Sequence, residues 1–360
     1  MNRMNPGLLR FHDTFEKRIW GGQKLRTLFN KDIARARVAE PIGEDWLISD
    51  HLSAESAVSE GTLAGLTLRS LIERDARAVL GQLPQLTPRG RFPLLLKLID
   101  AADVLSVQVH PDDDCARRLG EPDIGKTEMW HVLHADKGSE LICGLQPEVT
   151  PKKLRESVED GTVERLMPHY AAVEGLSLLV PAGAVHAIGA GVMLAEIQQN
   201  SDLTYRLYDW NRVDDDGKPR PLHLDKAFNA IHFGANPPCP VQPLTYDCTG
   251  ARCSVLAACP YFAAELIELN GRFRRNTDGR SFHILLVKTG AIQLSAGGDE
   301  TTLNSGQAAL VCGASPQFEL SGTGAVLDYY VPDIATDIIG RLQTAGHALE
   351  NIKSLGGGTF

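Results

Sequence analysis

The sequence predicts a mainly β chain with two β domains and a helical insertion in the first. Short apolar runs recur along residues 93–199 and again from residue 253, with Gly, Pro and Asp between them. The 360 residues include Gly 34 and Pro 20, counts that fit a fold with many turns. One well-marked helical segment comes before the first series of runs. Together these observations favour antiparallel sandwiches or barrels.

The helical segment covers residues 68–80. Thr67 is a good N-cap for it, and Gly81 is a good stop. It belongs to a helical region at about residues 50–92. A second, shorter helix is expected at 152–158, where Thr150 caps the helix and Pro151 takes the first helical position.

Two series of strands are expected, one in each domain. The first series is 94–99, 104–110, 128–134, 140–145, 177–180 and 192–198. The second is 254–258, 262–269, 282–287, 291–294, 307–311 and 325–331. The Pro-rich stretch 236–240 reads as a linker. The predicted domains are therefore 1–235, which contains the helical region, and 240–360.

Composition excludes several classes of protein. The formal net charge of -9, without a basic block, argues against a nucleic-acid partner. No apolar run approaches the roughly 20 residues that span a bilayer, and the first 15 residues lack the apolar core of a secretory signal. The seven cysteines form no CxxC pair, which argues against a zinc finger. Reduced thiols in a cytoplasmic protein are the simpler interpretation.

Three strand-like segments carry side chains suited to a metal ion. Alternation along a strand places Gln108 and His110 on one face, with Ser106. Glu128 begins the next segment, and His186 lies in a Gly-rich turn between two strands. Together Gln108, His110, Glu128 and His186 offer two nitrogen and two oxygen ligands. Such a set suits Zn²⁺ or a similar divalent ion with one position open for substrate oxygens.

Several motifs, in order, resemble type I mannose-6-phosphate isomerases, zinc enzymes of the cupin superfamily. The resemblance covers about residues 15–230, and no motif can be named in 240–360. The motifs are RIWGG at 18–22, EDWLIS at 44–49, SVQVHP at 106–111, KTEMW at 126–130, HAIGAG at 186–191 and EIQQNSDLTYRLYDW at 196–210. Thr127 replaces the Pro of some relatives and keeps the spacing between Lys126 and Glu128.

The resemblance implies a fold, a site and a reaction. The fold is two cupin-type (jelly-roll) β-barrels, with the metal in the first. The ligands are Gln108, His110, Glu128 and His186, holding one Zn²⁺ or another divalent ion per chain, and Arg206 is the catalytic arginine. The reaction interconverts D-mannose 6-phosphate and D-fructose 6-phosphate through a cis-enediol.

Other roles follow from the needs of this reaction. A group must carry a proton between adjacent carbons, and Lys126, Asp202, Glu196 or a water on the metal are candidates. The phosphate needs cations and hydroxyl donors, for which Lys97, Ser106 and Lys126 are the choices. Lys97 interrupts an apolar run, so the alternative for it is an edge strand with its ammonium group in solvent.

The sequence leaves two other functions open. A non-catalytic sugar-phosphate-binding cupin would keep the fold without turnover, although the complete ligand set and Arg206 argue against it. A cupin iron oxygenase more often has a His-x-His pair, and Gln108 stands where its first His would be. His283, alone in an apolar run of the second domain, is expected to be a hydrogen-bonded core imidazole. The expected partner is a small sugar phosphate, and the sequence predicts no oligomeric state.

Overall fold

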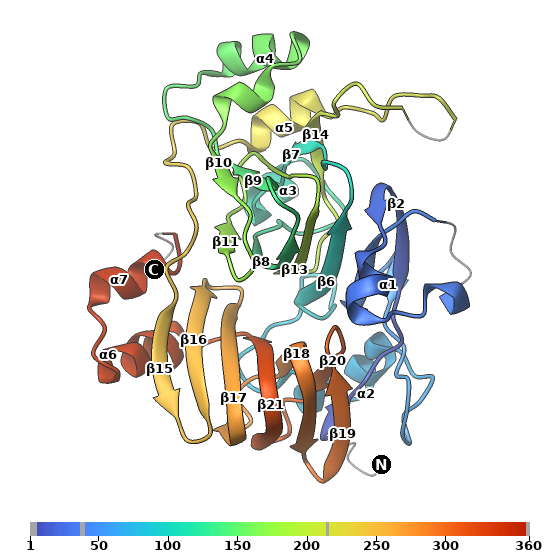
Figure 1. Cartoon of the computed structure of the whole chain (residues 1–360), viewed down its shortest axis with the longest axis vertical. Helices are drawn as coiled ribbons and strands as arrows, with labels where there is room; N and C mark the ends of the chain where they lie inside the picture. Colours follow the sequence, from blue (N-terminus) through green and yellow to red (C-terminus); the bar gives the residue numbers. More distant parts are fainter. Residues whose placement is uncertain (1–5, 37–39, 214–215, 358–360) are drawn as a thin grey trace. The chain divides into compact units, whose positions relative to one another are not determined.

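The computed structural model describes residues 6–36, 40–213 and 216–357, and the chain forms two compact units (Figure 1). Unit 1 contains residues 1–14, 46–96 and 241–360, and unit 2 contains residues 15–45 and 97–240. The chain passes from one unit to the other after Thr14, within strands β3 and β6, and after Pro240. This grouping differs from the predicted domains, because residues 1–14 and the helical region belong with the C-terminal strands.

Unit 2 is built on two antiparallel sheets. The six-stranded sheet runs in the order β11 (Ser177–Val180), β8 (Glu128–Ala135), β13 (Val192–Gln199), β6 (Leu94–Ala101), β2 (Phe15–Gly22) and β3 (Ile42–Ile48). The five-stranded sheet runs in the order β10 (His169–Ala171), β9 (Glu140–Cys143), β12 (His186–Ile188), β7 (Val107–Val109) and β14 (Tyr205–Tyr208). The strands β6 and β13 are buried along their whole length, which is why they read as nearly continuous apolar runs.

Short helices cover part of unit 2. They are α1 (Lys24–Phe29), η1 (Ile33–Ala36), α3 (Asp113–Arg118), α4 (Pro151–Glu159), η2 (Val163–Leu166) and α5 (Leu224–Ala230). The α4 helix begins as predicted, since the Thr150 side chain accepts a hydrogen bond from Lys153 N and Pro151 is in the first turn.

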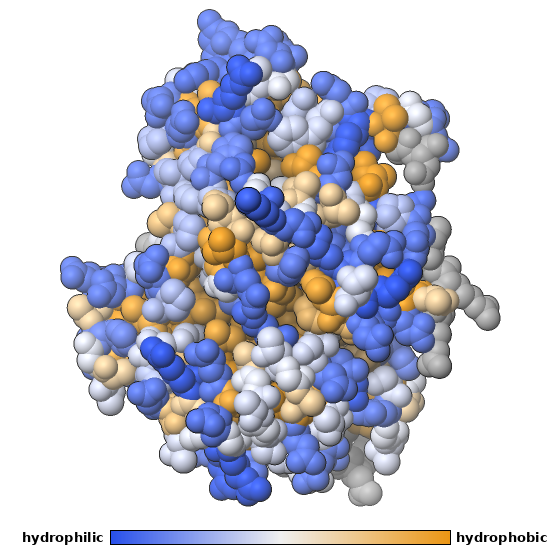
Figure 2. All heavy atoms as spheres, in the orientation of Figure 1, coloured by the Kyte–Doolittle hydropathy of each residue, from blue (hydrophilic) through white to orange (hydrophobic). Residues whose placement is uncertain are grey.

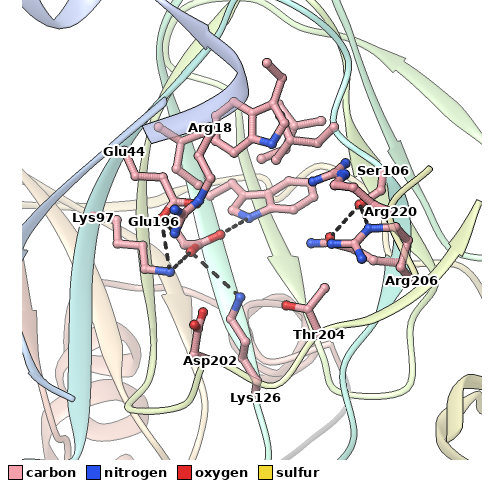
Figure 3. Close-up of a pocket in the computed structure, with 16 residues that line it drawn as sticks. Arg18, Glu44, Lys97, Ser106, Lys126, Glu196, Asp202, Thr204, Arg206 and Arg220 are labelled. Atoms are coloured by element: carbon pink, nitrogen blue, oxygen red, sulfur yellow. Dashed lines mark hydrogen bonds and ion pairs between the residues drawn. The ribbon is translucent and has the colours of Figure 1, made fainter. Parts of the chain in front are cut away.

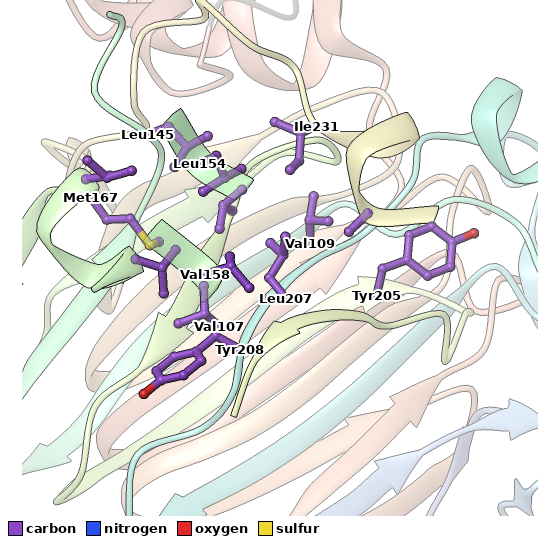
Figure 4. Close-up of a cluster of buried hydrophobic side chains, with 14 of the residues drawn as sticks. Val107, Val109, Leu145, Leu154, Val158, Met167, Tyr205, Leu207, Tyr208 and Ile231 are labelled. Carbon is purple, nitrogen blue, oxygen red and sulfur yellow. The ribbon is translucent and has the colours of Figure 1, made fainter. Parts of the chain in front are cut away.

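An apolar core lies between the five-stranded sheet and helices α4 and α5 (Figure 4). Val107 and Val109 of β7 pack into this core with Leu154 of α4, Leu207 of β14 and Ile231. Because alternate residues of a strand face opposite ways, burying these two valines turns the intervening side chain of β7 to the other face of the sheet. The strand parity expected from the sequence therefore sets one wall of the site.

Unit 1 is built on one large antiparallel sheet. Its order is β1 (Leu8–Leu9), β20 (Ala308–Val311), β18 (His283–Ala296), β21 (Gln317–Tyr330), β17 (Ala263–Asn276), β16 (Ala251–Ala258) and β15 (Leu244–Cys248), with β19 (Asp299–Asn304) on β18. A small hairpin pairs β4 (Asp50–His51) with β5 (Ala54–Glu55). The helices are α2 (Leu68–Leu80), the π-helix η3 (Ile334–Gly340), α6 (Arg341–Thr344) and α7 (Leu349–Ser354).

The mainly β fold class is confirmed, but several strands differ from the predicted ones. The expected strands at 282–287 and 291–294 are parts of one long strand, β18. No strand was predicted in the first 50 residues, which contribute β2 and β3, and these two strands pair with each other. The α2 helix has the predicted bounds, with Thr67 as N-cap and Gly81 as C-cap.

The surface carries mixed side chains. On the face drawn in Figure 2, hydrophilic residues predominate and apolar ones lie between them in small groups. Among the described residues no helix has both the length and the apolar character needed to cross a bilayer.

Candidate metal centre and active site

A cavity of about 420 Å³ opens in unit 2. Its lining is polar and mixed in charge, with cationic and carboxylate side chains facing one another (Figure 3). The lining residues are Arg18, Trp20, Glu44, Lys97, Ile99, Leu105, Ser106, Gln108, Lys126, Trp130, Ile188, Glu196, Asp202, Thr204, Arg206 and Arg220. The cavity therefore contains all the residues predicted for proton transfer and phosphate binding, and one of the four predicted ligands.

The other three predicted ligands form a buried cluster. One ligand atom from each of His110, Glu128 and His186 lies within 4.8 Å of the others. His110 Nε2 is 3.3 Å from Glu128 Oε2, and His186 Nε2 is 3.5 Å from Glu128 Oε1. Pairing of β12 with β7 sets His186 opposite Gln108, whose Nε2 lies 3.3 Å from His186 Nε2.

Backbone carbonyls fix the tautomer of both imidazoles. His110 Nδ1 lies 2.7 Å from Leu203 O, and His186 Nδ1 lies 2.9 Å from Ala184 O. In a neutral ring the Nδ1–H donates to the carbonyl, so Nε2 carries the lone pair. Burial, followed by the nearby Lys126, lowers the pKa of His110 to about 3. Burial also lowers the pKa of His186, so both rings are neutral at pH 7.

These donors fit a divalent cation. The Nε2 atoms of two neutral imidazoles face the Glu128 carboxylate at 3.3 and 3.5 Å. Lys126 Nζ forms an ion pair with Glu128 Oε2 at 2.9 Å and lies 3.2 Å from His110 Nε2. Converging lone pairs and a buried carboxylate are stabilised by a cation, and imidazole with carboxylate suits Zn²⁺.

Gln108 fits the same set after one rotation. Its Oε1 accepts a hydrogen bond from Ser106 Oγ at 3.2 Å, while its Nε2 faces His186. A metal ligand must present Oε1, because the amide nitrogen has no free lone pair. A 180° turn of the amide exchanges the two atoms without moving the chain.

Opposite charges set the protonation of Glu128 and Lys126. Burial raises the pKa of Glu128, but the nearby Lys126 and His110 outweigh it and hold the pKa well below its usual range. Burial lowers the pKa of Lys126, but Glu128 and Glu196 outweigh it and raise the pKa above its usual value. The carboxylate is therefore ionised and the ammonium protonated at neutral pH.

Arg206 lies on the wall formed by β14. It pairs in register with Gln108 of β7, and its Nε donates to Ser106 Oγ at 3.3 Å. Arg220 also lines the cavity and is held by two hydrogen bonds to the carboxylate of Asp209. Burial and, after it, the positive charge of the nearby Arg220 lower the pKa of Arg206. The two guanidinium groups make this wall a cationic part of the cavity.

Lys97 and Glu196 lie on neighbouring inner strands. Lys97 Nζ is 3.9 Å from Glu196 Oε1, and Glu196 Oε2 accepts a hydrogen bond from Trp130 Nε1 at 3.0 Å. The edge-strand alternative for Lys97 is wrong: β6 lies between β13 and β2, and the side chain is 4% exposed. Burial and the charge of Glu128 raise the pKa of Glu196 to about 7.

Some pocket residues were not assigned from the sequence. Arg18, Glu44 and Arg220 line the cavity, although no role was predicted for them. Arg18 and Glu44 lie within the motifs RIWGG and EDWLIS, and this position in the motifs is the sequence feature that could have indicated a role in the site. Asp202 lines the cavity as expected, with its backbone N donating to Asp123 Oδ2 at 3.3 Å.

Together, the fold and the site define a β-rich protein with a candidate divalent-cation centre beside a cationic pocket for a small anionic ligand. The chain belongs to the type I mannose-6-phosphate isomerase family. Residues 8–125 match the family described as phosphomannose isomerase type I, catalytic domain. The mannose-6-phosphate isomerase of Streptococcus mutans is 34% identical over 290 residues, which cover 81% of this chain and 87% of that protein.

Solved structures give the same result for the fold. The mannose 6-phosphate isomerase of Bacillus subtilis superposes with a TM-score of 0.81 at 31% identity, covering 90% of this chain and 99% of that one. A mannose 6-phosphate isomerase bound with zinc and yttrium shares the fold, with a TM-score of 0.69 at 16% identity, covering 91% of this chain and 100% of that one. The cupin fold implied by the motifs is thereby confirmed.

Proposed function

We propose that this chain interconverts D-mannose 6-phosphate and D-fructose 6-phosphate with one Zn²⁺, or another divalent ion, held by Gln108, His110, Glu128 and His186. The observation that carries the proposal is the buried cluster of two neutral imidazoles and one ionised carboxylate beside a cationic pocket. The names and extent of the curated relatives support the same reaction.

The residues around the proposed ligands hold them in place for the metal. A bound divalent ion acts as a Lewis acid that polarises the sugar oxygens near C1 and C2. The carbonyls of Leu203 and Ala184 keep the two imidazole Nε2 atoms directed at the centre. Lys126 keeps the Glu128 carboxylate ionised and in place.

We propose Glu196 as the group that moves the proton between C2 and C1. Of the three candidates, Lys126 is protonated at neutral pH and cannot accept a proton. Asp202 is exposed, whereas Glu196 is buried in the cavity, and its pKa near 7 lets it both accept and return a proton. Arg206 is a fixed cation in the same cavity that stabilises the negative charge of the enediolate.

Phosphate binding was predicted for Lys97, Ser106 and Lys126. The two lysines lie against carboxylates, so their charges are largely balanced within the protein. We propose that Ser106 and Arg220 make the main phosphate contacts, because Asp209 binds Nε and Nη2 of Arg220 and leaves its Nη1 for the ligand, and that the lysines add long-range attraction.

A coupled assay tests the proposed function. Purified protein should convert mannose 6-phosphate to fructose 6-phosphate, lose turnover after chelation, and regain it with added Zn²⁺. Full turnover after complete chelation would contradict the role of the metal. Sugar-phosphate binding without turnover in the zinc-loaded protein would instead favour the non-catalytic alternative.

The location of the protein is part of the proposal. All seven cysteines are free thiols in the structure. We propose a cytoplasmic enzyme on this basis, because free thiols persist in a reducing compartment.

A further inference from the structure

Four charges of alternating sign lie along one wall of the cavity. Arg18 is on β2, Glu44 on β3, Lys97 on β6 and Glu196 on β13, and these strands are neighbours in the six-stranded sheet (Figure 3). The reaction as proposed uses Glu196 and leaves Arg18 and Glu44 without a task.

Arg18 holds Glu44 by two hydrogen bonds. Arg18 Nε donates to Glu44 Oε1 at 3.1 Å, and Nη2 donates to Oε2 at 2.9 Å. The remaining Nη1 donates to Glu16 Oε2 at 3.1 Å and to Lys17 O at 2.9 Å. A planar guanidinium bound in this way fixes both the position and the plane of a carboxylate.

Lys97 lies midway between two carboxylates. Its Nζ is 3.8 Å from Glu44 Oε2 and 3.9 Å from Glu196 Oε1. The side chain is 4% exposed, so water screens these charges little. The two carboxylates therefore attract the ammonium from nearly equal distances.

The position of the Lys97 ammonium between the two carboxylates bears on one oxygen of Glu196, Oε1. The other oxygen, Oε2, accepts the hydrogen bond from Trp130. Oε1 lies 3.9 Å from Lys97 Nζ and 4.0 Å from Lys126 Nζ, and no described residue donates a hydrogen bond to it. It is the oxygen of Glu196 that is left to exchange a proton with a substrate.

We propose that Arg18 and Glu44 are positioning residues, which hold the Lys97 ammonium away from Glu196 Oε1 and keep that oxygen open to the substrate. The inference rests on the proposed function, in which Glu196 moves the proton. Arg18 and Glu44 act through Lys97 and take no part in the chemical step.

Opposite changes in the two positioning residues should have opposite effects. The charges that act on Glu196 are those of Glu128, Lys126, Lys97 and Glu44. In Glu44→Gln the ammonium of Lys97 loses one attraction and moves onto Glu196, which lowers the pKa of that carboxyl. In Arg18→Gln the carboxylate of Glu44 loses the guanidinium charge and attracts Lys97 more strongly, which raises the pKa of Glu196.

The test compares Glu44→Gln and Arg18→Gln with a matched control, Glu16→Gln. Glu16 also pairs with Arg18, but no ion pair joins it to Lys97. We expect kcat of Glu44→Gln to fall about 10- to 100-fold with KM changed less than about twofold. Turnover by Arg18→Gln should fall at pH 7 and recover at higher pH. Glu16→Gln should keep wild-type kcat.

A second readout is independent of turnover. The indole N–H of Trp130 donates to Glu196, so its NMR resonance reports the protonation of that carboxyl. The titration midpoint should move to lower pH in Glu44→Gln and to higher pH in Arg18→Gln. Circular dichroism establishes that each variant is folded, and Arg18→Gln, with a side chain 27% exposed, carries the test if Glu44→Gln does not fold.

Three results would overturn the inference: midpoints that do not move, midpoints that move in the same direction, or a change in KM alone. The last would make Arg18 and Glu44 substrate contacts. If the wild-type protein does not turn over mannose 6-phosphate, the proposed function fails. The NMR midpoints then still decide whether the pair controls Glu196.

Discussion

Each unit buries a glutamate, and the two glutamates have opposite surroundings. In unit 1, Glu265 accepts hydrogen bonds from Arg275 and Arg341, both at 2.8 Å, and from the hydroxyls of Tyr246 and Tyr330. In unit 2, Glu128 has Lys126 as its cationic partner at 2.9 Å and faces the Nε2 atoms of two neutral imidazoles. A buried carboxylate with several cationic and hydroxyl donors serves stability, whereas one that faces imidazole lone pairs is suited to share a cation with them.

One histidine in each unit, His283 and His110, shows the same difference in surroundings. His283 in unit 1 hydrogen-bonds through Nδ1 to the carboxylate of Asp328 at 2.8 Å, as expected for a core imidazole. His110 in unit 2 uses Nδ1 for a backbone carbonyl and turns Nε2 toward Glu128. One imidazole is held by an ion-pair network, while the other keeps a lone pair available for a metal.

The largest difference is expected from removing these two histidines. His110→Ala should lose bound zinc and turnover to background, because one of four ligands is removed. His283→Ala should keep zinc and turnover and lose stability. Metal analysis and the coupled assay on both variants check this, and zinc retained by His110→Ala would break the comparison.

A second contrast concerns the arginines. Arg206→Ala should lower kcat by about 10² to 10³-fold, because a fixed cation near the developing charge is lost. Its stability should change little, since Arg206 makes no ion pair with a described carboxylate. Steady-state kinetics measures kcat, and urea denaturation measures the free energy of unfolding. A wild-type kcat in Arg206→Ala would contradict the role of Arg206 in stabilising the enediolate.

Arg275→Ala should show the reverse behaviour. Arg275 donates to Glu265 and Asp328, both buried, so its removal takes one cationic partner from each of two buried carboxylates. We expect unfolding free energy to fall by about 3–5 kcal/mol. The folded fraction should keep its kcat, and urea denaturation monitored with activity would show whether the two effects separate.

The smallest expected effect is on the pH dependence of stability. Burial raises the pKa of Glu265, but Arg275 and Arg341 outweigh it and lower the pKa to about 2, against 4.5 ordinarily. The stabilisation is present above pH 4.5 and is lost as pH falls toward 2, an effect of about 3 kcal/mol. Denaturation curves from pH 6 to pH 2 should show this loss, and Glu265→Gln should lack it.

The candidate metal ligands could be named from the sequence because residue type and strand alternation indicate them locally. Strand alternation predicts Gln108 and His110 on one face, and in the structure His186 pairs with Gln108 and clusters with His110 and Glu128. The helix caps Thr67 and Thr150 could also be predicted, because an N-cap depends only on a hydrogen bond to a residue three positions further along the chain.

The surroundings of Lys97 could not be predicted, because they depend on which strands become neighbours. The sequence shows a charge in an apolar run, but the position of β6 between β13 and β2 brings Glu44 and Glu196 to it. Arg18 and Glu44 are 26 residues apart, and nothing in either local pattern indicates that they pair. The grouping of residues 1–14 and 46–96 with the C-terminal strands is also a long-range property.

The most direct test of the central claim is zinc content measured together with turnover. Samples of the wild-type protein taken along a chelator titration are analysed for zinc per chain by mass spectrometry and for conversion of mannose 6-phosphate. The account predicts that the rate falls in proportion to zinc as the content drops from one ion per chain, and that Glu128→Gln retains neither. An unchanged rate in protein stripped of every divalent ion would contradict it.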